Sequence, residues 1–335
     1  MGRSNVGEGQ YNVKAVCRLT GLNEHTLRSW ERRYSAITPD RQENRRRLYS
    51  RDDVERLRLL VRLVEHGYAI GQVAPLGDQE LKGLVSQHEA MEEKQQKSAG
   101  TKLDQPDPSL REAAQERMKS IIVALQTFDL EKLQVELDQA RLEYGAKDLL
   151  LQIFLPVMVE VGHLVFHNRL DIGQEHALTA LIRGHLLDIF FQTRRIQSYR
   201  QSHKTVSKRT VVVSTPEGDL HEIGILVASI FCTEAGLNIA YIGPNMPPDA
   251  LARVAQELEA HALMVGLSPL PPGVTPQTPR EFIRDLAAKL PPYCAIWLGG
   301  MIPPPEDLQG ISHELKTYRT MNELLSDLNE IRRTS

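Results

Sequence analysis

Apolar residues recur at helical spacing in the first eighty residues and again from Ser109 to about Arg200. This spacing places apolar side chains on one face of each helix, so it predicts two helical regions. In the second region Pro156 is the only proline, and the pattern breaks near Phe128, Gly145 and Asn168 to Gly173. Three breaks between apolar segments indicate a bundle of four helices.

The pattern changes after residue 209, where short runs rich in valine and isoleucine alternate with amphipathic helical segments. Such alternation predicts a doubly wound, Rossmann-like parallel sheet whose ligand site lies at the C-terminal ends of the strands. The expected strands are Thr210 to Ser214, Asn238 to Ile242, Ala262 to Leu267, Ala295 to Leu298 and Lys316 to Tyr318.

Two polar stretches, Glu89 to Pro108 and Gln201 to Arg209, divide the chain. The first is rich in Lys, Gln, Ser and Gly, which is typical of a linker. A chain of 335 residues is long enough for several cores. We therefore predict a multidomain α and α/β protein with a helical head (1–82), a linker (83–108), a four-helix bundle (109–200) and a sheet domain (201–335).

The formal net charge of -3 conceals a basic segment between Thr26 and Arg47. Seven arginines face three acidic residues there, an excess of four positive charges. Such an excess indicates a surface that binds a polyanion. The arginines are Arg28, Arg32, Arg33, Arg41, Arg45, Arg46 and Arg47.

The three cysteines, Cys17, Cys232 and Cys294, form no CxxC motif or Cys/His cluster, so we interpret them as ordinary reduced thiols. The N-terminal residues lack the apolar stretch of a signal peptide, and no uncharged run approaches the roughly 20 residues of a membrane span. We therefore expect a cytoplasmic protein without a membrane partner. No nucleophile-base pair or metal cluster stands out, which argues against an enzyme.

Two short helices are predicted within the head. Asn23 is a suitable N-cap for a helix that runs to about Tyr34, and a helix from Val13 to Leu19 ends at Thr20 and Gly21. This is helix-turn-helix spacing. Donors on the second helix and the following loop could reach base edges and phosphates, although a solvated helix face is the simpler alternative. These donors are His25, Arg28, Ser29, Arg32, Arg33, Arg41, Arg45, Arg46 and Arg47.

The segment from Tyr11 to Leu76 closely resembles the winged helix-turn-helix of MerR-family regulators. This resemblance implies binding of double-stranded promoter DNA by a homo-oligomer, with Tyr49 as a further DNA contact and with Trp30 and Tyr34 in the core. The thiols of metal-sensing members are absent after the head, so we do not expect metal sensing. The matching elements are Thr26 to Arg28, Trp30 to Tyr34, Arg47 to Tyr49, Asp53 with Val54, and Gly67 with Tyr68 and Ile70.

The segment Glu217 to Gly224, between the first strand and its helix, contains an Asp-x-His sequence. At a strand end the His221 side chain would project into the crevice, and Asp219 could accept its second ring N–H and fix the tautomer. Gly224 would leave room for a bulky group. Asp-x-His alone is a weak signal, but small or polar residues also follow the third and fourth strands. These are Ser268, Leu270, Gly299 and Gly300.

The order DxHxxG, SxL and GG resembles the cobalamin-binding domain of methionine synthase, methylmalonyl-CoA mutase and corrinoid carrier proteins. The resemblance implies that His221 is the metal ligand that replaces the dimethylbenzimidazole of cobalamin on cobalt. Asp219 would support His221. The tail of the cofactor would lie beside Gly224, Ser268, Leu270, Gly299 and Gly300.

The bundle resembles the cap of light-responsive, cobalamin-dependent MerR-type repressors of carotenoid genes, which carry Trp, nine residues, and then Glu-His. Glu175 and His176 match, which implies contacts with the ribose of an adenosyl upper ligand and with the corrin. Val165 and Phe166 replace the Trp and the light-associated His of that family, so control by light stays an open alternative. An ordinary place in the bundle core is the other explanation for these two residues.

These observations predict a regulator whose DNA binding or assembly, as a dimer or tetramer, is controlled by bound cobalamin, most simply adenosylcobalamin. In the resembling family the cofactor assembles a repressor in the dark and light releases the DNA. Two alternatives stay open: a corrinoid carrier or cobalamin-dependent enzyme subunit, and a regulator of the same fold that senses another tetrapyrrole. The operator, the upper ligand and the direction of regulation are not determined by the sequence.

Overall fold

The computed structural model describes residues 11–41, 47–65, 70–86, 108–201, 209–268, 270 and 275–334. It divides into two compact units, one made of 1–112 and 160–172, the other of 113–159 and 173–335. Arg45 and Arg46, the pair Gly67 and Tyr68, and residues 87–107 of the linker predicted at 83–108 lie outside the described residues. Residues 83–86 are helical.

The helix-turn-helix forms as its capping residues predict. Helix α1 (Val13–Thr20) begins after Asn12, and α2 (Glu24–Tyr34) begins after Asn23, whose side-chain oxygen accepts a 2.8 Å hydrogen bond from the Thr26 backbone N–H. Gly21 ends α1 with φ +77°, a conformation that glycine adopts without a steric cost. The predicted helix-turn-helix spacing is thereby confirmed.

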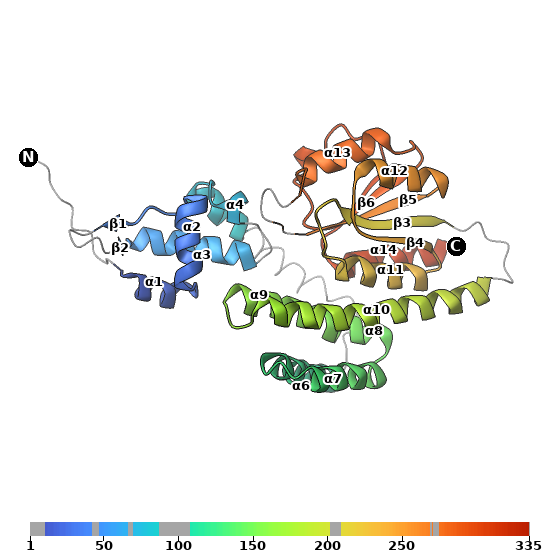
Figure 1. Cartoon of the computed structure of the whole chain (residues 1–335). Coiled ribbons are helices and arrows are strands. Elements are labelled where there is room, and N and C mark those ends of the chain that lie inside the picture. The colour runs from blue at the N-terminus through green and yellow to red at the C-terminus, as the bar shows by residue number, and fades with distance from the viewer. Residues whose placement is uncertain are drawn as a thin grey trace, which may run out of the picture. The chain divides into compact units, whose positions relative to one another are not determined.

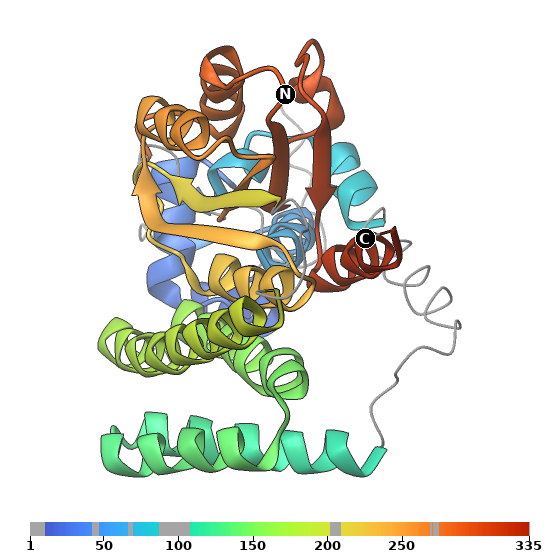
Figure 2. The same cartoon turned by 90° about the vertical axis from the view of Figure 1, so that its right-hand side faces the viewer.

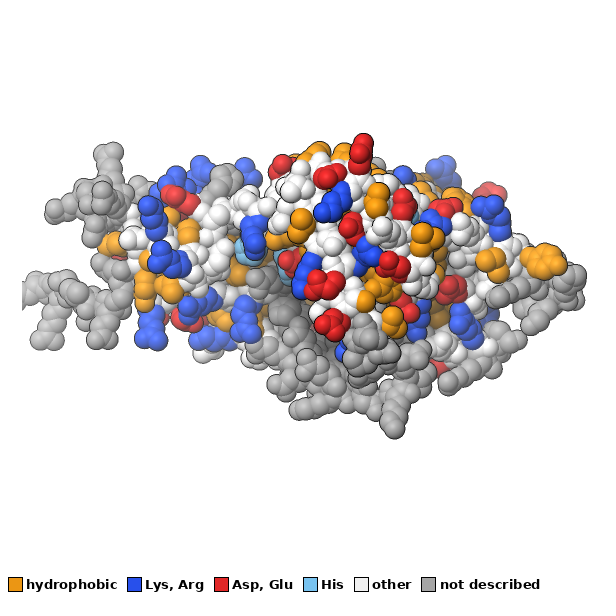
Figure 3. Space-filling view, turned by 90° about the horizontal axis from the view of Figure 1, so that it is seen from below, with side chains coloured by type: hydrophobic (Ala, Val, Ile, Leu, Met, Phe, Trp, Pro, Cys, Tyr) orange, Lys and Arg blue, Asp and Glu red, His pale blue; other side chains and the backbone are white. Residues whose placement is uncertain are grey.

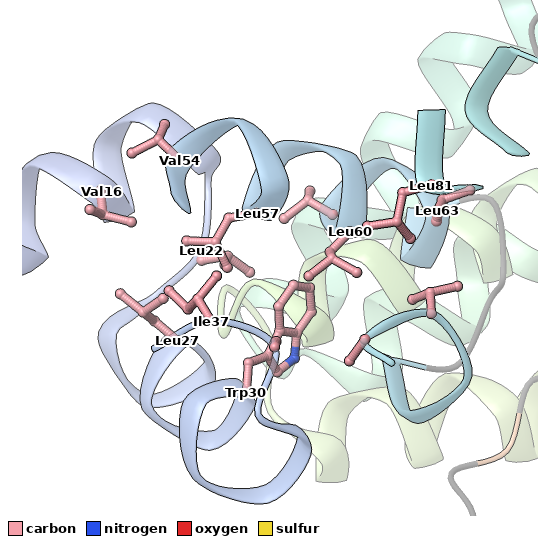
Figure 4. Packing of buried hydrophobic residues seen from close by; sticks show 14 of the residues in the cluster. Val16, Leu22, Leu27, Trp30, Ile37, Val54, Leu57, Leu60, Leu63 and Leu81 are labelled. Atoms are coloured by element: carbon pink, nitrogen blue, oxygen red, sulfur yellow. The ribbon is translucent and has the colours of Figure 1, made fainter. Parts of the chain in front are cut away.

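The rest of the head consists of a two-stranded ribbon and further helices. Strands β1 (Asp40–Arg41) and β2 (Arg47–Leu48) pair antiparallel, and α3 (Arg51–Glu65), α4 (Ile70–Val73) and a helix over residues 78–86 follow. Figure 4 shows the buried core in which side chains of α1 and α2 meet those of α3. Trp30 lies in this core at 3% exposure and Tyr34 packs against it, as predicted.

The segment Glu160–Ile172 belongs to the same compact unit as the head. Phe166 packs against the head core, with its ring centroid 6.2 Å from that of Trp30. Nδ1 of His167 lies 3.1 Å from the backbone oxygen of Gly21. The interpretation of Phe166 as an ordinary bundle core residue was therefore wrong, because its apolar partner is the core of the head.

The second helical region contains four helical rods, as predicted. They are α6 (Pro108–Gln126), α7 (Leu130–Glu143), the continuous rod of α8 (Ala146–Asp148), a π-helical turn (Leu149–Phe154) and α9 (Leu155–Phe166), and α10 (Ile172–Gln201). The rods are separated near Phe128, Gly145 and Asn168, where Phe128 and Asn168 adopt positive φ angles of 55° and 53°.

One helix in the described part of the chain, Ala146–Phe166, is long and apolar enough to cross a membrane by length and composition alone. Its apolar side chains are core residues of the bundle: Leu150, Ile153, Phe154 and Val157 are all 0% exposed. Since a core helix of a bundle passes the same test, this single helix is weak support for a membrane span.

The C-terminal region forms the predicted doubly wound parallel sheet. The strands are β3 (Thr210–Pro216), β4 (Asn238–Met246), β5 (Ala262–Leu267), β6 (Ala295–Gly300) and β7 (Leu315–Tyr318), in the spatial order β4-β3-β5-β6-β7. All neighbouring pairs are parallel, so the C-terminal ends share one edge. Strand β4 runs four residues beyond the predicted end, and its pairing with β3 is irregular there.

Helices cover both faces of this sheet (Figures 1 and 2). Helices α11 (Ile223–Glu234) and α14 (Met321–Thr334) lie on one face, and α12 (Pro248–Glu257) and α13 (Pro279–Lys289) lie on the other. The strands are therefore buried on both sides, which explains their continuous apolar runs. Val212, Leu263 and Ile296 are each 0% exposed.

Candidate functional site

The turn after β3 holds the predicted histidine in a hydrogen-bonded loop. Asp219 is 1% exposed, and its Oδ1 accepts hydrogen bonds from the backbone N–H and from Nδ1 of His221, both at 3.0 Å. Its Oδ2 accepts a 3.1 Å hydrogen bond from the backbone N–H of Ser268. One buried carboxylate therefore joins the loops that follow β3 and β5.

The His221 side chain is oriented by Asp219 and is 64% exposed. Its pKa is raised, first by the hydrogen bond to Asp219 and further by the negative charges of Asp219 and Glu175, against the opposing effect of burial. With Nδ1–H donating to the carboxylate, Nε2 carries the lone pair, and this arrangement suits a metal ligand. Asp219 thus occupies the supporting position that the sequence predicts.

A second set of hydrogen bonds fixes the backbone of the same turn. The Thr215 hydroxyl donates to the carbonyl of Asp219 at 2.5 Å and accepts from the backbone N–H of Asn245 at 2.9 Å. The side-chain oxygen of Asn245 accepts from the backbone N–H of Gly218 at 2.7 Å. Neither Thr215 nor Asn245 was predicted from the sequence as part of this site. The only available signal was an asparagine after a strand, a residue that tolerates the φ of +66° found here.

Glycines at this edge fall into two groups. A Cβ atom added to Gly224 or Gly299 would meet nothing within 4 Å, so packing within the protein does not require glycine at either position. At Gly300 (φ +86°) a Cβ would lie 2.4 Å from the carbonyl oxygen of Leu267, and at Gly266 it would lie 2.4 Å from Cγ2 of Ile225. Gly300 and Gly266 are therefore required by the fold, whereas Gly224, three residues after His221, and Gly299, at the end of β6, each leave open space.

The residues present fit a corrin with a histidine ligand. The free lone pair of His221 and the open space at Gly224 and Gly299 lie on one edge of the sheet. Ser268 and Leu270 on the same edge are half-buried, and Leu220, next to His221, is 68% exposed. An exposed apolar side chain beside a polar ligand suits the mixed surface of a tetrapyrrole.

The first turn of α10 carries the two matched residues of the bundle. Glu175 is half-buried and lies close enough to His221 for its charge to raise the pKa of the imidazole. His176 is exposed. Glu175 is therefore within electrostatic range of His221, although the two are far apart in the sequence. Val165 belongs to the other compact unit and is half-buried there.

The predicted DNA-reading arginines of α2 lie on its exposed face. Arg28, Arg32 and Arg33 are exposed, and Arg28 forms an ion pair with Glu24 one turn earlier. Ser29 is half-buried. Lys and Arg side chains predominate over acidic ones on the part of the surface formed by the head, at the left of Figure 3. The backbones of His25 and Arg41 lie in α2 and β1.

Tyr49 departs from its expected role. Its side chain is 0% exposed, and its hydroxyl donates a 2.5 Å hydrogen bond to Oε1 of Glu31. Burial, and then this hydrogen bond, raise the pKa of Tyr49. Arg47 places Nε 2.9 Å from Oε2 of the same carboxylate. We therefore correct the assignment: Tyr49 is a core residue that orients Glu31, which in turn holds Arg47, and it is not a surface donor to DNA.

Two protein families match the chain. Residues 11–79 match the family described as MerR HTH family regulatory protein, and residues 118–186 match the family described as B12 binding domain. The chain therefore carries a MerR helix-turn-helix domain followed by a B12-binding domain, whose matched part is the helical bundle.

Curated relatives share this arrangement over most of the chain. It is 26% identical over 298 residues to the HTH-type transcriptional repressor CarH of Myxococcus xanthus, covering 88% of this chain and 90% of that protein. It is 26% identical over 294 residues to the HTH-type transcriptional repressor CarA of the same organism, covering 86% of each. The chain is a homologue of these two repressors.

Among solved structures, the monomethylamine corrinoid protein of Methanosarcina barkeri is 14% identical. The match covers 65% of this chain and 99% of that protein with a TM-score of 0.48. Because this score is below 0.5, the similarity does not bear on the function of this chain.

Proposed function

We propose that this chain is a transcriptional regulator whose bound cobalamin is held by Nε2 of His221 as the lower ligand of cobalt. The observation that carries the proposal is the hydrogen bond between Nδ1 of His221 and the buried Asp219, which leaves the lone pair of Nε2 available to a metal. Open space at Gly224 and Gly299, on the same edge of the sheet, would leave room for the ring and tail of the cofactor. The supporting contacts would come from Ser268, Leu270 and Gly300.

The upper face of the corrin would meet the bundle. Glu175 and His176 stand at the start of α10, and the charge of Glu175 already acts on His221. We assign Glu175 to the ribose of an adenosyl group and His176 to the corrin. When bound, adenosylcobalamin supplies a cobalt–carbon bond that light can break.

The head would bind double-stranded promoter DNA as a homo-oligomer, a dimer or a tetramer. His25, Ser29 and the arginines of α2 would meet the major groove, and the arginines from Arg41 to Arg47 would contact phosphates. The relatives are named transcriptional repressors, so we propose repression and a cytoplasmic, non-enzymatic protein. We keep the division into 1–82, 83–108, 109–200 and 201–335 as part of this proposal.

Cofactor control requires a difference in affinity. Cobalamin can change DNA binding only if it binds the DNA-competent assembly and the incompetent one with unequal free energies. Light can reverse this change in DNA binding only if the cobalamin that remains after illumination binds the two assemblies with equal free energies. Because Phe166 occupies the position of the family's light-associated histidine and packs on the head core, light release needs its own test.

The experiment is purification of the full chain with adenosylcobalamin, followed by absorption spectra and DNA gel shifts before and after green light. We expect a bound-cobalamin spectrum and a cobalamin-dependent gel shift. DNA affinity that is the same with and without cobalamin would overturn cofactor control, and affinity unchanged by light would remove only the photoreceptor part.

The His221→Ala variant tests the ligand assignment in the same preparation. We expect loss of the spectrum of histidine-ligated cobalamin and a lower affinity for the cofactor. Full cobalamin affinity with an unchanged spectrum would contradict the assignment. Binding of haem or a bilin in place of cobalamin would favour a regulator that senses another tetrapyrrole.

A further inference from the structure

Glu222, the residue after His221, is a buried carboxylate that joins three elements. It is 9% exposed and stands at the N-cap position of α11. Its Oε1 accepts a 2.5 Å hydrogen bond from Nε of Arg183 on α10, and its Oε2 accepts a hydrogen bond from the hydroxyl of Tyr241 on β4. Both carboxylate oxygens of Glu222 are therefore engaged by residues of α10 and β4, while Asp219 holds the neighbouring His221.

Two further residues of α10 contact β4 and α11. Phe190, seven residues after Arg183 and so on the same helix face, packs edge-on against Tyr241 with ring centroids 6.1 Å apart. Gln197, seven residues further, donates a 3.1 Å hydrogen bond to the carbonyl of Glu234 at the end of α11. Helix α10 therefore runs alongside α11 (Figures 1 and 2), and Glu222 joins the two where α11 begins.

This attachment lies close to the candidate cofactor site. Arg183 is eight residues, about 12 Å of helix, beyond Glu175 on α10. Glu222 is covalently next to His221, and Glu175 acts electrostatically on His221. The Arg183–Glu222 pair therefore fixes how the loop that bears His221 is placed against the first turn of α10.

We propose that Glu222, with Arg183 and Tyr241, is a positioning residue for the corrin: it sets the separation between His221 below the ring and the start of α10 above it. This inference rests on the proposed function. The Arg183–Glu222 pair combines charge with a direct hydrogen bond at a site where the carboxylate is buried, and such pairs hold geometry better than neutral ones. A bond from imidazole to cobalt is sensitive to small displacements of the nitrogen, so loosening the loop weakens that bond.

The test compares Glu222→Gln and Arg183→Met, singly and combined, in the full chain. Glutamine keeps the size of Glu222 and one acceptor for Tyr241, but its amide group lacks the charge that holds Arg183. The matched control is Asp188→Asn, which breaks an ion pair of α10 with Arg141 of α7 and so loosens the bundle instead of the His221 loop. Readouts are the dissociation constant for adenosylcobalamin and the electron paramagnetic resonance spectrum of bound cob(II)alamin, whose splitting reports nitrogen on cobalt.

We expect each single variant to bind adenosylcobalamin about tenfold more weakly, and the combined variant to be no weaker than either one. The nitrogen splitting should decrease in all three, and Asp188→Asn should match the wild type in both readouts. If Glu222→Gln fails to fold, Arg183→Met decides the test, because the Arg183 side chain is half-exposed and its replacement is better tolerated.

Wild-type affinity and splitting in both single variants, alongside loss of binding in His221→Ala, would overturn the positioning role and leave the proposed function intact. An equal loss in Asp188→Asn would also overturn it, because the effect would then follow general loosening of α10. If the wild type binds no cobalamin, both proposals fail together.

Discussion

The head and the edge of the parallel sheet present their functional side chains in opposite ways. On α2, Arg32 and Arg33 extend into solvent, and Arg28 forms an ion pair with Glu24, which is itself exposed. At the sheet edge, His221 is fixed by a carboxylate that is itself 1% exposed and held by another loop. The first surface offers charge in an adaptable form, and the second offers one nitrogen in a fixed position.

This difference indicates what each surface can recognise. A long, regular polyanion such as DNA tolerates mobile arginines, because each phosphate contact adds a modest and similar free energy. A single coordinate bond needs a prepared geometry. Single substitutions should therefore have large effects at the sheet edge and smaller, salt-dependent effects on the head.

The largest effect is expected from Asp219→Asn. The carboxylate accepts three N–H groups, and an amide would turn its NH2 group toward one of them. Cobalamin affinity should fall roughly 10- to 100-fold, as at other metal sites that lose a supporting carboxylate. Titration monitored by the absorption spectrum measures this, and an unchanged affinity would show that the fixed imidazole is unimportant.

Next comes a pair of glycine variants. Gly224→Leu places a side chain in open space, so it should keep the stability of the domain and lower cobalamin affinity by about tenfold. Gly300→Ala, with φ +86° and a backbone oxygen 2.4 Å from the new Cβ, should cost about 2 kcal/mol of unfolding free energy or more. Urea unfolding and cobalamin titration separate the two. Equal loss of stability in both variants would remove the argument that Gly224 makes room for a ligand.

Tyr49→Phe tests whether the tyrosine belongs to the core or to the DNA surface. Removing the hydroxyl leaves Glu31 without its buried hydrogen bond, which should lower the unfolding free energy of the head by about 1 kcal/mol. Under conditions in which both proteins are folded, the DNA affinity of Tyr49→Phe should equal that of the wild type. Circular dichroism melts and fluorescence anisotropy with labelled DNA give the two values, and weaker DNA binding at unchanged stability would restore the role as a DNA contact.

Arg32→Ala should have a smaller effect on the head. Loss of one phosphate contact should weaken DNA binding by about threefold to tenfold and reduce the slope of log affinity against log salt by about one unit. Arg253→Ala, on the exposed face of α12, is the matched control and should change neither value. Anisotropy titrations at several salt concentrations provide the measurement. An unchanged slope for Arg32→Ala would mean that the outer face of α2 does not meet DNA.

The smallest effect concerns pH. His185 is 8% exposed in the bundle, and burial lowers its pKa from the ordinary value of 6.5, outweighing the charges of Asp138 and Asp188 that oppose the shift. Arg141 acts in the same direction as burial. The unfolded chain therefore takes up this proton more readily, so stability should fall as pH drops below about 6.5.

The difference between the wild type and His185→Gln isolates this effect. His221, whose pKa is raised, changes stability in the opposite sense but is present in both proteins. Urea unfolding should be measured between about pH 7.5 and about pH 5, a range that spans the ordinary histidine pKa. The free energy of unfolding of the wild type should fall across this range, and that of His185→Gln should not show this part of the fall. Parallel pH profiles would contradict the burial argument.

Local signals predicted the elements well. The N-cap at Asn23, the glycine after α1 and the apolar runs of the strands are short-range features, and each element begins at or within one residue of its predicted start. The site motif also predicted the contact between Asp219 and His221, because two residues in one tight turn have few alternative arrangements.

What the sequence did not predict depends on contacts between distant segments. Tyr49 is buried in the core of the head, where its hydroxyl meets Glu31 from α2. Phe166 belongs with Trp30 only through tertiary packing. Glu222 meets Arg183 and Tyr241 across two other elements. No spacing rule within one segment contains that information, and the roles of the site residues toward DNA and cofactor stay predictions.

The unbroken course of α10 has a mechanical consequence. Its 30 residues form a rod about 45 Å long, with no proline to absorb bending. A tilt of about 5° at the turn that bears Glu175 moves the opposite end by about 4 Å. A small change in the direction of α10 near its first turn is thereby amplified along the rod toward Gln201.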